Sequence, residues 1–123
     1  MAGDVLVEVV ASDGCLVIRI SGALDYLSIP VLMEKLRPLI ARGDRSMVLD
    51  LSGVTFCDSS GLNALLLARQ QAERRGLKLA VACVPPQPLR VLTMTGADQL
   101  LLVHDTVAEA GTAVRHRADR PDA

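Results

Sequence analysis

The sequence contains few aromatic residues and no excess of positive charge. Phenylalanine and tyrosine together make up 2% of the chain, tryptophan is absent, and the formal net charge at pH 7 is −1. Proteins that bind nucleic acids usually combine a concentrated positive surface with aromatic side chains that stack on bases. The composition therefore argues against nucleic-acid binding. It also predicts a hydrophobic core built from Leu, Val, Ile and Ala.

Signals for export, membrane insertion and disulfide pairing are also missing. The cysteines Cys15, Cys57 and Cys83 form no C-x-x-C pair, and the first residues lack the basic and apolar blocks of a secretory signal. No apolar run approaches the roughly 20 residues needed to cross a bilayer. We therefore expect a soluble, cytoplasmic protein with reduced thiols and no membrane partner.

Motifs of common catalytic and cofactor sites are absent as well. The serine pair at positions 59–60 lacks the leading glycine of the G-x-S-x-G nucleophile turn, and no phosphate-binding glycine loop or metal-ligand spacing occurs. Neither His104 nor His116 is placed near a serine by the sequence. Asp50 and Asp58 could form a carboxylate pair, although Asp50 could equally accept a hydrogen bond from a turn. These features argue against an enzyme, a cofactor site or a metal site.

The sequence does contain short apolar strands alternating with amphipathic helices. We predict strands at residues 5–10, 15–20, 47–51, 77–83 and 100–103, and helices at 28–43, 59–75, 89–95 and 106–114. Ser28 is the candidate cap of the first helix. Pro38 should kink that helix or end it early, because proline lacks a backbone donor and crowds the preceding turn.

The order of these elements predicts an α/β fold. The first two strands should form a hairpin through a turn at residues 12–14, and the strand, helix and strand over 47–83 imply parallel pairing. We therefore expect a small mixed, mostly parallel β-sheet with helices packed against it. A single domain should cover residues 1–115, and residues 116–123 should form a polar, disordered tail.

The stretch C-D-S-S-G-L at residues 57–62 lies where the second helix should begin. The first N–H groups of a helix have no intrahelical partner, and the helix dipole makes this end positive. Asp58 or Ser59 could therefore be the N-cap, which contributes about 1 kcal/mol. The same groups would receive a phosphate, and phosphorylation of a serine would add about −1.5 to −2 charges. The stretch thus predicts a helix cap, a phosphate acceptor, or both.

Residues 48–62, V-L-D-L-S-G-V-T-F-C-D-S-S-G-L, resemble the signature of the STAS domain in the branch of bacterial anti-sigma factor antagonists. The G-A-L-D run at 22–25 is similar to the second motif of that family, and T-G-A at 95–97 is similar to a third. The resemblance extends over residues 5 to about 114. It implies a small sheet flanked by helices, which agrees with the order of the predicted elements.

The resemblance also implies a function, which is regulation by partner switching without catalytic activity. Such a protein, when unphosphorylated, binds an anti-sigma factor that is also an ATP-dependent serine kinase, and this binding releases a sigma factor. The kinase phosphorylates the serine after the signature aspartate, here Ser59, and the phosphoprotein dissociates. A metal-dependent serine phosphatase then resets it. Asp58 would orient this site, and Ser60 would be a neighbouring cap or packing residue.

The residues that we expect to bind the partner are Asp25, Tyr26, Asp58, Ser60 and Gly61. A tyrosine in a chain so poor in aromatic residues either fills the core or anchors an interface, and we favour the interface for Tyr26. Gly61 either lets a partner backbone approach closely or eases a tight turn, and we favour the close approach.

Two other functions remain open from the sequence alone. The chain could be a STAS-type interaction subunit without a phosphorylation switch, within a signalling or lipid-transport complex. It could also be a small hydrolase with Ser59 as its nucleophile. Phosphate transfer from a kinase would support the switch, whereas labelling of Ser59 by a fluorophosphonate would support the hydrolase.

Overall fold

The computed structural model describes residues 5–11, 14–43 and 45–119. The strands are β1 (Val5–Ala11), β2 (Leu16–Leu24), β3 (Met47–Cys57), β4 (Leu79–Ala82) and β5 (Val103–His104). The helices are α1 (Ile29–Arg42), α2 (Ser59–Arg74), α3 (Pro86–Thr95), α4 (Ala97–Leu101) and α5 (Val107–Asp119). No helix in the described ranges has the length and apolar character needed to cross a membrane.

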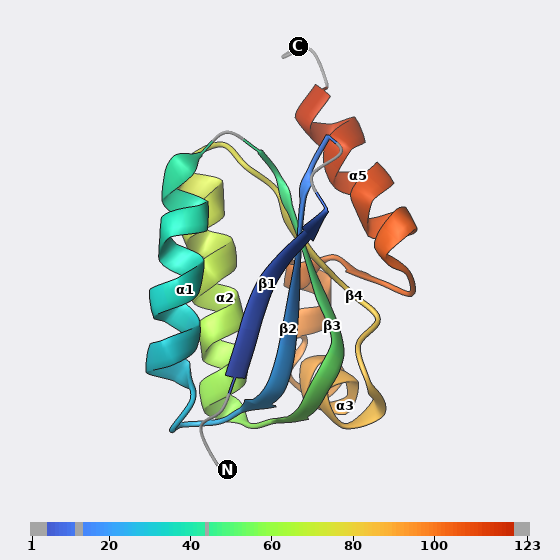
Figure 1. Ribbon diagram of the computed structural model, residues 1–123. Helices are drawn as coiled ribbons and strands as arrows, with labels where there is room; N and C mark the ends of the chain where they lie inside the picture. Colours follow the sequence, from blue (N-terminus) through green and yellow to red (C-terminus); the bar gives the residue numbers. More distant parts are fainter. Residues whose placement is uncertain (1–4, 12–13, 44, 120–123) are drawn as a thin grey trace.

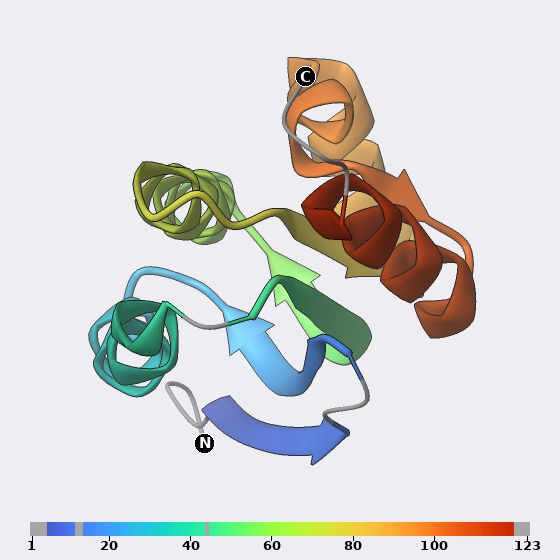
Figure 2. The ribbon, with the colours of Figure 1, turned by 90° about the horizontal axis from the view of Figure 1, so that it is seen from above.

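The strands form one sheet in the order β1-β2-β3-β4-β5, of which Figure 1 labels β1 to β4. β1 is antiparallel to β2, and every later neighbour in this order is parallel. Helices α1 and α2 lie on one side of the sheet and α5 lies on the other (Figure 2). The predicted α/β class, with a mixed and mostly parallel sheet, is therefore confirmed.

The two faces of the sheet carry side chains of different size. Along β4, Leu79 and Val81 belong to the large cluster beneath α1 and α2, whereas Ala80 and Ala82 belong to the smaller cluster beneath α5. Successive strand residues point to opposite faces, so this alternation separates two apolar layers. No aromatic side chain is buried among the described residues, and the core is aliphatic, as the composition predicts.

Strand β3 is longer than the predicted run at residues 47–51. It continues to Cys57, because β2 pairs with it in parallel until Leu24 lies opposite Cys57. The extension is only partly covered, with Ser52, Thr55 and Phe56 exposed and Val54 and Cys57 buried. The continuous apolar run therefore marks only the half of β3 that is covered on both faces.

The predicted strand at residues 100–103 is wrong over most of its length. Residues 97–101 form α4, and β5 contains only Val103 and His104. Leu101 is buried and Leu100 is exposed, and the chain turns between the two elements at Leu102, which has a positive φ of 54°. A run of apolar residues this short does not distinguish a helix from a strand.

Other boundaries differ at the ends of the chain and at its turns. α3 begins at Pro86, before the predicted start at residue 89, and α5 continues to Asp119, into the segment where we expected a polar tail. Residues 12 and 13, which we assigned to a turn, and residues 120–123 of the expected tail lie outside the described residues.

Pro38 lies inside α1 and does not end it. The helix continues to Arg42 and is followed by Gly43 in the left-handed conformation. Leu36 and Ile40, on either side of the proline, are both buried. Burial of this apolar face therefore holds the helix together across the missing backbone donor.

Replacing Pro38 with alanine should stabilise the protein. Proline in a helix interior is about 3 kcal/mol less favourable than alanine, and up to about 1 kcal/mol of that gain is offset by a more flexible unfolded chain. We expect Pro38→Ala to raise the free energy of unfolding by about 2 kcal/mol, measured by urea denaturation followed by circular dichroism. Arg37→Ala, one exposed position earlier, is the control and should change stability by less than about 0.5 kcal/mol.

Candidate functional site

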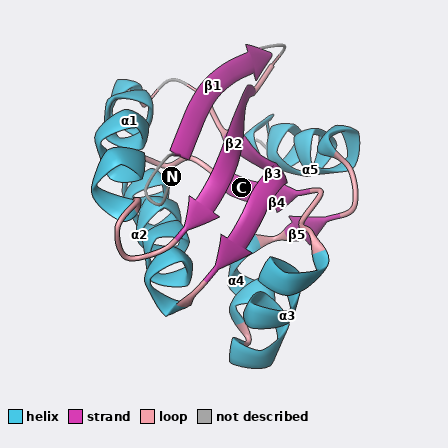
Figure 3. Ribbon diagram, turned by 60° about the horizontal axis from the view of Figure 1, so that its bottom comes forward, coloured by secondary structure: helices cyan, strands magenta, loops and turns pink. Residues whose placement is uncertain are grey.

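The ends of β2 and β3 bring two distant parts of the sequence together. In the register of the parallel pair, Leu24 lies opposite Cys57 and Ala23 opposite Phe56. The segment that leads into α1 follows β2, and α2 follows β3 (Figure 3). The G-A-L-D and C-D-S-S-G-L stretches therefore meet at one edge of the sheet.

Asp58 is the N-cap of α2. Its backbone is extended, and its carboxylate accepts a hydrogen bond from the Gly61 N–H at 3.0 Å. The first intrahelical bond runs from the Leu62 N–H to the Asp58 carbonyl at 2.9 Å. The sequence left Asp58 and Ser59 as candidate N-caps of this helix. The structure shows that Asp58 is the N-cap and that Ser59 is the first helical residue. Ser59 is exposed and Ser60 is half-buried.

Gly61 is buried against the end of β2 in its own chain. A Cβ atom added to Gly61 would overlap the Leu24 carbonyl oxygen and would lie 2.7 Å from the Leu24 Cβ. The same carbonyl accepts the Asp58 N–H at 3.3 Å. The close backbone approach at this glycine therefore occurs within the protein, and contact between Gly61 and a partner stays a prediction.

Asp25 fixes the turn between β2 and α1. Its carboxylate accepts hydrogen bonds from the N–H groups of Leu27 at 3.1 Å and Ser28 at 3.0 Å. The buried Ser28 hydroxyl accepts the Asp25 N–H at 3.0 Å and reaches the Ala23 carbonyl at 2.6 Å. Ser28 occupies the N-cap position of α1, as predicted, but its side chain makes no capping bond because its hydroxyl turns back to the strand. A role for Asp25 in partner binding stays a prediction.

Three large apolar side chains are exposed at this edge. Tyr26 is 76% exposed, Leu27 is 60% exposed and Phe56 is 43% exposed. Tyr26 therefore does not fill the core, and its role as an interface anchor stays a prediction. Sequence reasoning missed Phe56, because β2 and β3 shift register between Gly22 and Ala23 and this shift alters which side chains are covered.

Gln87, in the first turn of α3, holds the last residue of β3. Its Oε1 accepts the Cys57 N–H and its Nε2 donates to the Cys57 carbonyl, both at 2.9 Å. β4 ends at Ala82, which lies opposite Asp50, so it supplies no ladder bonds this far along β3. The Gln87 amide takes the place of a strand residue and fixes the chain one residue before Asp58. Sequence reasoning did not identify this residue.

The described side chains around Ser59 do not form a nucleophile with its base. Burial, and secondarily the charge of Asp58, raise the pKa of Cys57 to about 11, so that this thiol stays protonated at neutral pH. His104 on β5 pairs with Ala82 on β4, and Ala82 pairs with Asp50 on β3. Asp50 precedes Cys57 by seven residues along β3. At about 3.3 Å per residue, the seven residues from Asp50 to Cys57 span about 23 Å along the sheet.

The two aspartates considered as a carboxylate pair have separate structural partners. Asp50 is buried, lies 3.4 Å from the Arg19 guanidinium and accepts the Ser52 N–H at 3.0 Å. Asp58 instead caps α2. The two carboxylates therefore serve different elements and do not act as an acid–base pair.

Comparisons with known proteins identify the family. The chain belongs to the STAS domain family, which residues 7–110 match. It is 31% identical over 100 residues to an anti-sigma F factor antagonist of Paenibacillus polymyxa, covering 80% of this chain and 86% of that protein. It is 29% identical over 118 residues to the anti-sigma-F factor antagonist RsfB of Mycobacterium tuberculosis, covering 95% and 96%.

The fold agrees with this assignment. A crystal structure of an anti-sigma factor antagonist from Mycobacterium paratuberculosis aligns with a TM-score of 0.84 and 28% sequence identity, over 94% of this chain and 97% of that one. The STAS resemblance read from residues 22–25, 48–62 and 95–97 is thereby confirmed.

Gly61→Ala should destabilise the protein, although alanine is the better helix former by about 1 kcal/mol. The added methyl group would overlap the Leu24 carbonyl, and overpacking of this kind typically costs about 1–3 kcal/mol. We expect a lower midpoint in urea denaturation. Ser60→Ala, in the same helical turn, is the matched control and should stay close to the wild type. A Gly61→Ala protein as stable as the wild type would show that α2 can shift freely away from β2.

Gln87→Glu should loosen the end of β3 at neutral pH. One carboxylate oxygen can still accept the Cys57 N–H, but the other would face the Cys57 carbonyl, at a cost of about 1–3 kcal/mol. We expect faster hydrogen exchange at the Cys57 amide, with partial recovery at acidic pH, where a protonated carboxyl can donate again. Gln99→Glu, at an exposed position of α4, is the control. Unchanged exchange at Cys57 would contradict a positioning role for Gln87.

Proposed function

We propose that this protein is an anti-sigma factor antagonist that is switched by phosphorylation of Ser59. In the unphosphorylated form it binds an anti-sigma factor and thereby frees a sigma factor, and the phosphorylated form dissociates. The observation that carries this proposal is the exposed Ser59 at the first position of α2, directly after the capping Asp58, in a chain whose relatives bear the name of anti-sigma factor antagonists.

The start of α2 suits a phosphate because its backbone donors are available. The Asp58 carboxylate takes the Gly61 N–H, while the N–H groups of Ser59 and Ser60 precede the first intrahelical bond and have no partner within the helix. The positive end of the helix dipole favours an anion at this place. Phosphorylation would therefore leave the fold intact and change the surface by about −1.5 to −2 charges.

A partner docked over this edge would respond strongly to that charge. Apolar surface is exposed at the edge of the sheet that leads to Ser59, by Tyr26, Leu27 and Phe56. Binding through such a surface requires that water be excluded from the centre of the interface. A phosphate at Ser59 would resist this desolvation, and the nearby Asp58 would add repulsion toward an acidic partner.

The five predicted partner-binding residues would divide into two roles. Tyr26 and Ser60 would contact the anti-sigma factor directly. Asp25, Asp58 and Gly61 would shape the surface, since their side chains or backbone already hold the two helix starts in place.

The other parts of the proposed cycle lie outside this chain. The anti-sigma factor would also be the ATP-dependent serine kinase, and a metal-dependent serine phosphatase would restore the free serine. The antagonist itself would need no cofactor and no catalytic activity. It would act in the cytoplasm as a single domain.

Substitutions of Ser59 test the switch. Ser59→Ala should bind the anti-sigma factor as tightly as the wild type and accept no phosphate from it. Ser59→Asp should bind at least about tenfold more weakly, because it places a permanent charge in the interface. Calorimetry would measure both affinities, using an anti-sigma factor co-purified from the native cytoplasm and identified by mass spectrometry.

Ser60→Ala keeps Ser59 and should still accept phosphate on Ser59 from the same kinase and ATP, although it removes one hydroxyl from the proposed interface. Peptide mapping that places the phosphate only on Ser60 would contradict the assignment to Ser59. Binding without phosphate transfer from any kinase of the cell would instead support a STAS-type interaction subunit that has no switch.

A further inference from the structure

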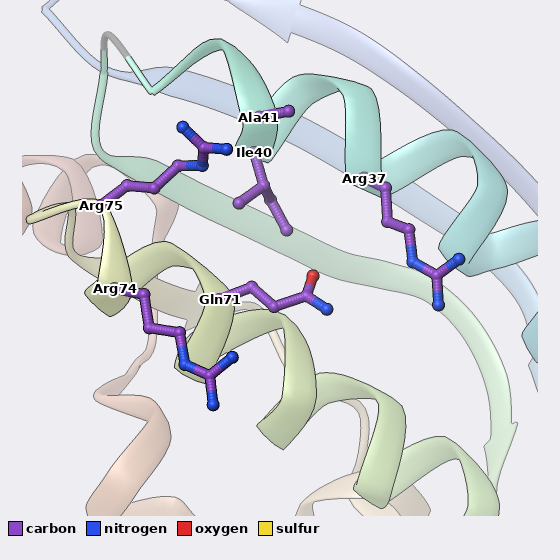
Figure 4. Close-up of a pocket in the computed structure, with 6 residues that line it drawn as sticks. All are labelled: Arg37, Ile40, Ala41, Gln71, Arg74 and Arg75. Atoms are coloured by element: carbon purple, nitrogen blue, oxygen red, sulfur yellow. The ribbon is translucent and has the colours of Figure 1, made fainter.

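A pocket lies between the carboxyl-terminal parts of α1 and α2. Its volume is about 480 Å³, and it is lined by Arg37, Ile40 and Ala41 of α1 and by Gln71, Arg74 and Arg75 at the end of α2 (Figure 4). Both sets of residues have the spacing i, i+3, i+4, which places three side chains on one face of each helix. We call these six residues the arginine groove.

The arginine groove concentrates positive charge in a protein whose net charge is −1. The lining residues that the structure describes carry three guanidinium groups and no carboxylate. Arg37 approaches from α1, Arg74 and Arg75 come from the end of α2, and Gln71 lies between them (Figure 4). The buried Ile40 contributes an apolar wall.

Arginines near the end of a helix often serve its last carbonyl groups. Here, backbone groups already do so. The Gly43 N–H donates to the Ile40 carbonyl at 3.0 Å, and the Arg75 and Gly76 N–H groups donate to the carbonyls of Ala72 and Glu73, both at 2.9 Å. Capping of these carbonyls therefore does not occupy the guanidinium groups.

The three guanidinium groups are not engaged elsewhere in the described part of the chain. The side chains of Arg37, Arg74 and Arg75 make no hydrogen bond or ion pair to a described residue. By contrast, Arg69, on the same helix as Arg74, pairs with Glu73 at 2.9 Å. No described residue therefore takes the planar donors of the three arginines around this pocket.

We propose that the arginine groove binds a small soluble molecule that carries a multivalent phosphate group. Guanidinium groups donate paired hydrogen bonds that match the oxygens of phosphate, and three of them suit an anion with several charges. A pocket of this volume holds a small molecule. None of the six lining residues exposes a large apolar side chain that could enter a bilayer, which favours a soluble ligand over a lipid headgroup.

This site is distinct from the one proposed for the anti-sigma factor. α2 begins at Ser59 and ends at Arg74, and its 16 residues span about 24 Å at 1.5 Å per residue. The arginine groove and Ser59 therefore lie at opposite ends of the same helix. Ser59→Ala should leave binding of the phosphate ligand in the arginine groove unchanged. Failure of the proposed phosphorylation switch therefore does not imply failure of the proposed ligand site, and the reverse also holds.

Calorimetry with inorganic tripolyphosphate at constant ionic strength tests the proposal. We expect saturable binding of one tripolyphosphate per chain, weakened about tenfold or more in the Arg37→Gln/Arg75→Gln double variant. The Lys35→Gln/Arg90→Gln double variant removes the same charge from exposed positions outside the groove. It should change the affinity by less than about twofold, because distant surface charges are screened. Circular dichroism melts establish that both variants are folded.

Three results would overturn the proposal. The first is no saturable binding of tripolyphosphate by the wild type, and the second is an equal loss of affinity in both double variants. The third is binding of citrate as tight as that of tripolyphosphate, which would show attraction by charge alone. If the first result were accompanied by binding to vesicles that contain phosphoinositides, the groove would be assigned to a membrane surface in place of a soluble ligand.

Discussion

The contact between Gly61 and the Leu24 carbonyl is the constraint on which this edge of the molecule depends. The carbonyl oxygen lies where a side chain of residue 61 would start, and it also accepts the Asp58 N–H. Together these contacts dock the first turn of α2 directly on the end of β2. The capping bond of Asp58 and the exposure of Ser59 follow from that position. A larger residue at position 61 would separate the helix from the strand and disturb both.

The parts of this arrangement that depend on local chemistry could be predicted from the sequence. A carboxylate or hydroxyl before an apolar helix is a cap in almost any fold, so the D-S-S-G stretch located the start of α2 and the exposed serine. The alternation of apolar segments likewise gave the α/β class. The prediction of an edge strand at 100–103 was wrong because so short an apolar run does not distinguish a helix from a strand.

The parts that depend on contacts between distant residues could not be predicted. The Gln87 amide reaches Cys57 across 30 positions of the sequence, and no local pattern identifies that pair. Ser28 had the sequence of a helix cap, but the neighbouring strand offered the Ala23 carbonyl to its hydroxyl. In both cases the hydrogen-bond partner of a polar side chain is a backbone group of the sheet. The position of that group depends on the register of the paired strands, which no local pattern in the sequence specifies.

The exposure of Tyr26 has an optical consequence. The chain has one tyrosine and no tryptophan, and that tyrosine is 76% exposed at the edge where β2 and β3 end. Its ultraviolet emission should therefore change little when the aliphatic core melts, because the ring is already in contact with water. The same emission should respond when another protein covers this edge. The molecule thus carries an intrinsic fluorophore that reports occupancy of its surface in preference to the state of its fold.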